Sequence, residues 1–296
     1  VEIPSLTVDA VNRITTMRTD PGGKGINVSK VISKLGGKSI AAGILGGDTG
    51  RAILSALEDM GLATCFHFVD GETRTNMKII DPVSRTNTDI NEPGVTVSEE
   101  ILDKLLSVLT DKVVEGDIVV ISGSMPKGSP KDTYYTWTKA FSAKGAKVIL
   151  DADGDLLRAG LKASPYLIKP NNHELSALVG RTLKTPEELA ETARELMKEY
   201  SIAKIVVSMG GDGALYVTPD ETIYAEGLKV PVGSTVGAGD SVVAALAAAE
   251  ESGMSLEDTV CLSTACGAAN VMCSGTQAAE YEVIESLIPR VVFHRI

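Results

Sequence analysis

The chain has 296 residues, of which 44% are hydrophobic and 23% charged, and this composition excludes an intrinsically disordered or a fibrous protein. Its 28 basic and 39 acidic residues give a net charge of −11, which argues against a protein that binds nucleic acid or a membrane surface. The sequence contains no apolar run of about 18 residues and no signal-peptide pattern at its start, so we expect a cytoplasmic protein.

Short apolar runs alternate with segments of helical periodicity from about residue 20 onward. This alternation predicts an α/β protein with a parallel sheet that is covered by helices. The predicted strands lie at residues 39–45, 117–122, 147–151, 166–168 and 205–208. The predicted helices lie at residues 26–35, 49–60, 99–112, 131–144 and 185–200. The last helix has the clearest start, because Thr185, Pro186 and Glu188 form a capping-box sequence with proline at the first helical position.

Two segments, residues 1–18 and 72–91, break this alternation. They are rich in Thr, Val, Ile and Arg, and no helical segment lies within them. We expect them to form the strands of a small separate β-sheet that projects from the edge of the protein. Residues 19–71 and 92–296 then form a single α/β core, since no linker or repeat divides the chain.

The first glycine-rich loop, residues 21–25, runs directly into a predicted helix. Its glycines, including Gly23, allow backbone N–H groups to approach an anion at the start of the helix. Lys24 adds a positive charge, and the amide of Asn27 can donate to and accept from hydroxyl groups. The alternative is a tight turn with a solvated lysine.

The second loop contains Gly237, Ala238, Gly239 and Asp240 and precedes a strongly apolar helical segment. Successive small residues at a helix N-terminus expose N–H donors where charge develops on a transferring phosphoryl group. Asp240 could simply complement the helix dipole. A carboxylate beside an anion site is unfavourable, however, unless it acts as the base for an incoming hydroxyl, and this conflict favours catalysis.

Two further motifs follow predicted strands. Asn171 and Glu174 offer oxygen ligands that suit Mg²⁺, although the same spacing fits a helix N-cap with a capping-box glutamate. The glycine turn of residues 208–213 could pass beneath a nucleotide or form an ordinary hairpin. The sequence contains no G-x-x-x-x-G-K-[ST] loop, no G-x-G-x-x-G in the first βα unit and no G-x-S-x-G elbow, which argues against the commonest nucleotide-binding and hydrolase motifs.

The motifs around Lys24, Lys169 and Asp240, in this order along the chain, resemble those of the ribokinase/PfkB family of sugar kinases. The resemblance spans nearly the whole sequence and implies a three-layer α/β/α Rossmann-like core with a small β-sheet lid. Lys24 and residues 73–78 are similar to the branch of the family that phosphorylates sugar phosphates. The substrate implied is fructose 1-phosphate, with tagatose 6-phosphate as the alternative. Relatives begin with an additional strand that ends near an N-P-x-x-D motif, and this sequence starts after that motif.

The resemblance also implies a role for each motif. Asp240 would take the proton of the sugar hydroxyl that attacks the γ-phosphate of ATP. The other implied groups are the N–H donors of Gly237, Ala238 and Gly239 for the developing charge, Lys24, Gly23, Asn27 and Arg74 for the sugar phosphate, Lys169, Ser208, Gly210 and Gly213 for ATP, and Asn171 and Glu174 for Mg²⁺.

Two other classes of function remain open at this point. A regulatory module could bind a nucleotide on the same scaffold without transferring a phosphoryl group, but the intact Asp240 and its glycine loop favour an enzyme. An interaction protein would need an exposed apolar lid. Relatives often dimerise through this lid, and we therefore also expect a possible homodimer.

Overall fold

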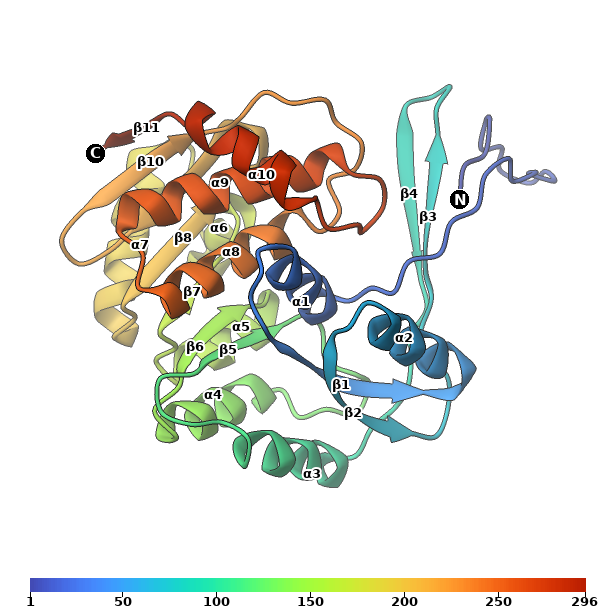
Figure 1. The fold of residues 1–296 in the computed structure, drawn as a ribbon, viewed down its shortest axis with the longest axis horizontal. Coiled ribbons are helices and arrows are strands. Elements are labelled where there is room, and N and C mark those ends of the chain that lie inside the picture. The colour runs from blue at the N-terminus through green and yellow to red at the C-terminus, as the bar shows by residue number, and fades with distance from the viewer.

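The computed structural model describes all residues, 1–296, and is built around a seven-stranded sheet with the order β11-β10-β9-β8-β7-β6-β5. Helices cover both faces of this sheet (Figure 1). The strands are β5 (Ile118–Ser122), β6 (Lys147–Asp151), β7 (Leu167–Ile168), β8 (Lys204–Ser208), β9 (Gly213–Val217), β10 (Thr222–Glu226) and β11 (Phe293–Arg295). The helices are α1 (Lys24–Lys34), α2 (Gly47–Asp59), α3 (Glu99–Thr110), α4 (Thr133–Ala143), α5 (Gly154–Leu161), α6 (Asn172–Val179), α7 (Pro186–Tyr200), α8 (Ala238–Ser252), α9 (Leu256–Met272) and α10 (Tyr281–Leu287).

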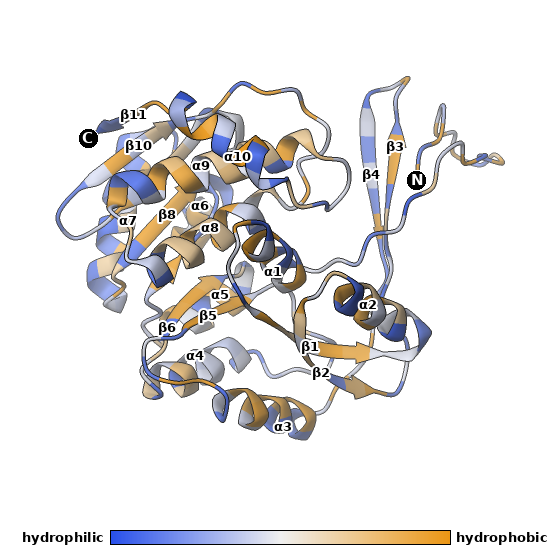
Figure 2. Ribbon diagram, viewed as in Figure 1, coloured by the Kyte–Doolittle hydropathy of each residue, from blue (hydrophilic) through white to orange (hydrophobic).

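The three layers follow from the alternation of side chains along the strands. In β6, Val148 and Leu150 pack with residues of α4, α5 and α7, whereas Ile149 between them packs with residues of α1, α8 and α9. All three side chains are fully buried. Successive residues of a strand point to opposite faces, so a strand that is apolar throughout must be covered on both sides. Figure 2 shows the strands of this sheet mostly in the hydrophobic colour.

The direction of the strands changes in one half of the sheet. Strands β5 to β8 are parallel, as predicted, but β9, β10 and β11 are antiparallel to their neighbours. The expected parallel arrangement is therefore confirmed for β5 to β8, and the turn of residues 208–213 forms the hairpin that was left open as an alternative. The physical reason is the connection: β8 and β9 are joined through the short 3₁₀ turn Gly210–Asp212, which is too short to cross over the sheet.

The sheet is also divided. Strands β1 (Ile40–Gly46) and β2 (Ala63–Val69) pair in parallel and form a two-stranded sheet of their own, with α2 between them in the chain. No ladder links β1 to β5. A cavity of about 1760 Å³ has residues of both strands in its lining and continues to the first glycine loop.

The small separate sheet consists of β3 (Asn76–Asp81) and β4 (Thr86–Asn91), an antiparallel hairpin that projects away from the core (Figure 1). Strands in residues 1–18 were also predicted, and this prediction is wrong. Only isolated bridges form there, from Glu2 to Thr16 and to Ile80. The Asn12 side chain exchanges hydrogen bonds with the backbone of Thr7, and such local bonds compete with strand pairing. The role of the hairpin as a lid stays a prediction.

The predicted helices are confirmed, with ends that differ by a few residues. The capping box at Thr185 is present, since its hydroxyl accepts from the backbone of Glu188 and the glutamate accepts from the backbone of Thr185. None of the helices is both long and apolar enough to cross a membrane.

Candidate active site

Two helices begin side by side at the carboxyl ends of the parallel strands. Gly23 caps α1 and Gly237 caps α8, and both glycines have positive φ angles, 122° and 83°, which other residues rarely adopt. The two helices pack against each other. Since the first N–H groups of a helix have no partner within the helix, both starts present donors and a partial positive charge to the same region.

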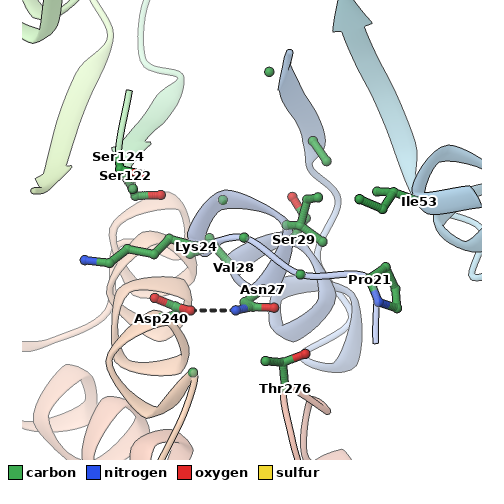
Figure 3. A pocket seen from close by; sticks show the side chains of 18 of the residues that line it. Pro21, Lys24, Asn27, Val28, Ser29, Ile53, Ser122, Ser124, Asp240 and Thr276 are labelled. Atoms are coloured by element: carbon green, nitrogen blue, oxygen red, sulfur yellow. Dashed lines mark hydrogen bonds between the residues drawn. The ribbon is translucent and has the colours of Figure 1, made fainter. Parts of the chain in front are cut away.

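Asp240 lies in the first turn of α8 and is held by Asn27 of α1. The Asn27 amide Nδ2 donates to Asp240 Oδ2 over 2.7 Å, and each residue is only 7% exposed (Figure 3). Burial raises the pKa of Asp240 above its ordinary value, while the hydrogen bond from Asn27 acts in the opposite direction. A buried carboxylate with a raised pKa is a stronger proton acceptor than an exposed one.

Lys24 and Lys169 place two positive charges near the Asp240 carboxylate, and both pair with the carboxylate of Asp151. Lys24 is the first residue of α1, and its Nζ lies 3.1 Å from Asp151 Oδ2 at the end of β6. Burial acts to lower the pKa of Lys24, but the attraction of Asp151, Asp240 and Glu174 raises it overall. Lys169 follows β7, is 5% exposed, and places its Nζ 3.3 Å from Asp151 Oδ1. Lys24 is therefore held in its charged form, and Lys169 pairs with the same carboxylate of Asp151.

Arg74 approaches the same region from the base of the hairpin. Its Nη2 donates to the Oγ of Ser124, which follows β5, over 2.9 Å. Gly23, Lys24, Asn27, Arg74 and Asp240 all contribute to the lining of the large cavity. The structure thus brings the residues predicted for the sugar phosphate together with the predicted base.

Three residues in the lining of this cavity carry a buried polar atom that has no partner within the protein. These atoms are the Oδ1 of Asn27, the Oγ of Ser122 and the Oγ of Ser39, which precedes β1. Figure 3 shows Ser122 and Asn27 around the same pocket as Lys24 and Asp240. A buried polar atom without a partner costs about 1–3 kcal/mol, so the pocket suits a ligand that carries hydroxyl groups.

Asn171 and Glu174 form the helix cap that the sequence left open as an alternative to a metal site. Asn171 Oδ1 accepts from the backbone of Glu174, and Glu174 Oε2 accepts from the backbone of Asn171, each over 2.8 Å. Glu174 Oε1 accepts no hydrogen bond, and the negative charge of Glu174 contributes to the raised pKa of Lys24. Together the two residues fit Mg²⁺ that keeps most of its water shell, but no group of three metal-binding side chains is present. The metal site stays a prediction.

The glycine turn between β8 and β9 lies next to this cap. Asn171 and Ser208 form an isolated bridge, and the Ser208 N–H donates to the carbonyl of Pro170 over 3.0 Å. Gly213 has a φ of 108°, and a β-carbon there would lie 2.0 Å from the carbonyl oxygen of Ala225. Close packing against β10 thus explains why residue 213 is a glycine, and no ligand is needed for this explanation. Contacts of Ser208, Gly210 and Gly213 with a nucleotide stay predictions.

Comparison with known proteins decides the family. The sequence profile of pfkB family carbohydrate kinases matches residues 3–282. The chain belongs to this family. The 1-phosphofructokinase of Rhodobacter capsulatus is 38% identical over 266 residues, which are 90% of this chain and 84% of that protein. The 1-phosphofructokinase of Bacillus subtilis is 35% identical over 296 residues, which are 100% of this chain and 95% of that protein.

Solved structures agree with membership of the pfkB family. Phosphofructokinase-2 from Escherichia coli, crystallised in complex with substrates and products, superposes with a TM-score of 0.93 at 31% identity, over 98% of this chain and 94% of that one. The expected fold class and the resemblance drawn from the sequence motifs are both confirmed.

One residue of this candidate site was not predicted from the sequence. Asp151 contacts both Lys24 and Lys169, although it belongs to no glycine loop. A signal for it does exist, because it is the last residue of a parallel strand, and ligands of open α/β sheets bind at that edge.

Proposed function

We propose that this protein transfers the γ-phosphate of ATP to fructose 1-phosphate, giving fructose 1,6-bisphosphate and ADP. The observation that carries this proposal is the buried carboxylate of Asp240 at the start of α8, held by Asn27 and accompanied by Lys24 and Lys169. A base beside a cationic site is what phosphoryl transfer to an alcohol requires. The relatives named 1-phosphofructokinase support the choice of substrate.

The sugar phosphate would bind in the large cavity. Lys24 and Arg74 supply the positive charges for its phosphate, which a protein with a net charge of −11 must provide locally. The unpartnered oxygens of Asn27 and Ser122 suit hydroxyl groups of the sugar. The N–H of Gly23, at the positive-φ cap of α1, lies at the same helix start.

The reaction follows from the position of Asp240. Its carboxylate accepts the proton of the attacking sugar hydroxyl while the hydroxyl oxygen forms a bond to the γ-phosphorus. The bond from this phosphorus to the oxygen that bridges the β- and γ-phosphates breaks, and ADP leaves with that electron pair. The N–H groups of Gly237, Ala238 and Gly239 face the charge that develops on the transferring group.

ATP and Mg²⁺ would lie on the side of β7 and β8. We propose that Lys169, Ser208, Gly210 and Gly213 contact the phosphates of ATP. Asn171 and Glu174 would hold Mg²⁺ through its water shell, and the ion would neutralise charge on the β- and γ-phosphates. Ser208 and Asn171 are already adjacent through their isolated bridge.

We also propose that β3 and β4, with residues 1–18, form a lid and that two copies pair through it. Met77 and Ile90 lie opposite each other in the hairpin, and both side chains are exposed. Figure 2 shows β3 largely in the hydrophobic colour although it projects from the core. Exposed apolar pairs of this kind mark interaction surfaces.

A cytoplasmic setting fits the four free cysteines, which persist as thiols in a reducing compartment.

A panel of sugar phosphates tests the substrate. Fructose 1-phosphate, tagatose 6-phosphate and fructose 6-phosphate are each supplied with ATP and Mg²⁺, and ADP formation is coupled to a second enzyme. We expect kcat/KM to be at least about tenfold higher for fructose 1-phosphate. A higher value for tagatose 6-phosphate would overturn the substrate. Nucleotide binding without turnover of any sugar would instead indicate a regulatory module.

A further inference from the structure

Asp151 is a buried carboxylate to which neither the family comparison nor the proposed reaction assigns a role. It is the last residue of β6, and only 3% of its side chain is exposed. Its two oxygens serve different partners, since Oδ2 lies 3.1 Å from the Nζ of Lys24 and Oδ1 lies 3.3 Å from the Nζ of Lys169. One negative charge is thus shared by two ammonium groups.

The two lysines belong to opposite sides of the proposed reaction. Lys24 opens α1 and contributes to the sugar-phosphate cavity. Lys169 follows β7, and its Nζ would lie 3.4 Å from a β-carbon built on Gly239, so it reaches the glycine loop of α8. Asp151 therefore connects the acceptor side of the site to the loop that faces the transferring group.

The geometry would not persist without the shared carboxylate. Two ammonium groups that approach one point repel each other, and a buried charge without a partner is strongly unfavourable. With both lysines in place, the negative charge of the Asp151 carboxylate is compensated, and each ammonium group keeps N–H donors that can bind other acceptors. The three side chains consequently hold one another in a fixed arrangement.

We infer that Asp151 is a positioning residue, which directs the ammonium group of Lys169 toward the phosphoryl group in transfer and that of Lys24 toward the phosphate of the sugar. Asp151 itself touches neither substrate. This inference rests on the proposed kinase function. Through Lys169 it tunes the interactions with the group in transfer, so its removal should lower kcat more than it changes the binding of ATP.

The first test is Asp151→Asn, which keeps the shape and removes the charge. We expect kcat to fall about 100-fold, the loss typical of a small misplacement of reacting groups. KM for ATP should change by less than about threefold. The matched control is Asp155→Asn, because Asp155 lies four residues further on and pairs with Lys131 at the surface, where both side chains are largely exposed. The control should keep the wild-type kcat.

A double-mutant cycle separates positioning from a purely structural role. Lys169→Met is combined with Asp151→Asn, and the loss in kcat should be at least about tenfold smaller than the product of the two single losses. Multiplicative losses would overturn the inference. So would an unchanged kcat in Asp151→Asn, with or without a lower melting temperature. A wild-type protein that turns over no sugar phosphate would count against the proposed function itself.

Discussion

Asp240 and Asn27 set the chemistry of the site at the scale of single residues. Burial raises the pKa of Asp240, so its protonation should stop the reaction at a higher pH than an ordinary aspartate would. The amide of Asn27 lowers this pKa by donating to the carboxylate. Asn27→Ala should therefore shift the acid limb of the kcat/KM profile to higher pH.

The comparison with the wild type is the control for this shift. The sugar phosphate itself titrates at a pH of about 6, but that contribution is the same for both proteins. An acid limb that stays in place, or that moves to lower pH in Asn27→Ala, would contradict the assignment of Asp240 as the base.

Lys24 gives a second prediction at the residue scale. Lys24→Met should raise KM for the sugar phosphate by about 10- to 100-fold, because the variant loses a charge-assisted hydrogen bond to the phosphate. Lys34→Met is the matched control, since Lys34 ends the same helix and pairs with Glu280 at the surface. Steady-state kinetics with both variants decide the matter, and an equal KM in the two would remove Lys24 from the phosphate site.

At the scale of elements, the turn between β8 and β9 requires glycine at position 213 but not at position 211. Gly213→Ala should lower the free energy of unfolding by about 1–3 kcal/mol, because φ is positive and the new methyl group would meet the carbonyl of Ala225. Gly211→Ala should be nearly neutral, since the space around its β-carbon is open. Thermal unfolding compares the two, and similar melting temperatures would contradict this explanation.

How far the sequence predicts these elements depends on whether the signal is local. The helices α1 and α7 and the hairpin of β3 and β4 were found because periodicity and caps lie within each segment. The hairpin of β8 and β9 was only one of two alternatives, β10 and β11 were not predicted, and strands were wrongly expected in residues 1–18. These features depend on what a segment meets in space rather than on its own pattern.

The candidate site shows the same limit. The glycine loops allow Lys24, Asn27 and Asp240 to be predicted as site residues, because each loop precedes an apolar helix. The only signal for Asp151 is its place at the end of a parallel strand, and its two ion pairs are found only when Lys24 and Lys169 converge on it. The Asn171–Glu174 pair remained ambiguous, since the oxygens that suit a metal are the ones that cap a helix.

At the scale of the whole molecule, the exposed face of the hairpin predicts a dimer. Light scattering with size-exclusion chromatography should find the wild type as a dimer and Ile90→Asp as a monomer with a similar melting temperature, because a charge placed in an apolar interface is costly. The control is Val114→Asp, because Val114 is also exposed but lies outside the hairpin, and this variant should remain a dimer. A monomeric wild type, or a dimeric Ile90→Asp variant, would contradict pairing through the lid.

The most direct measurement is phosphoryl transfer by Asp240→Asn under saturating ATP, Mg²⁺ and fructose 1-phosphate, alongside calorimetric binding of ATP. We predict that turnover falls about 1000-fold, as expected for the loss of a general base, while the Kd for ATP changes by less than about threefold. Turnover close to that of the wild type would show that the carboxylate on α8 does not receive the hydroxyl proton, and the proposed mechanism would fail.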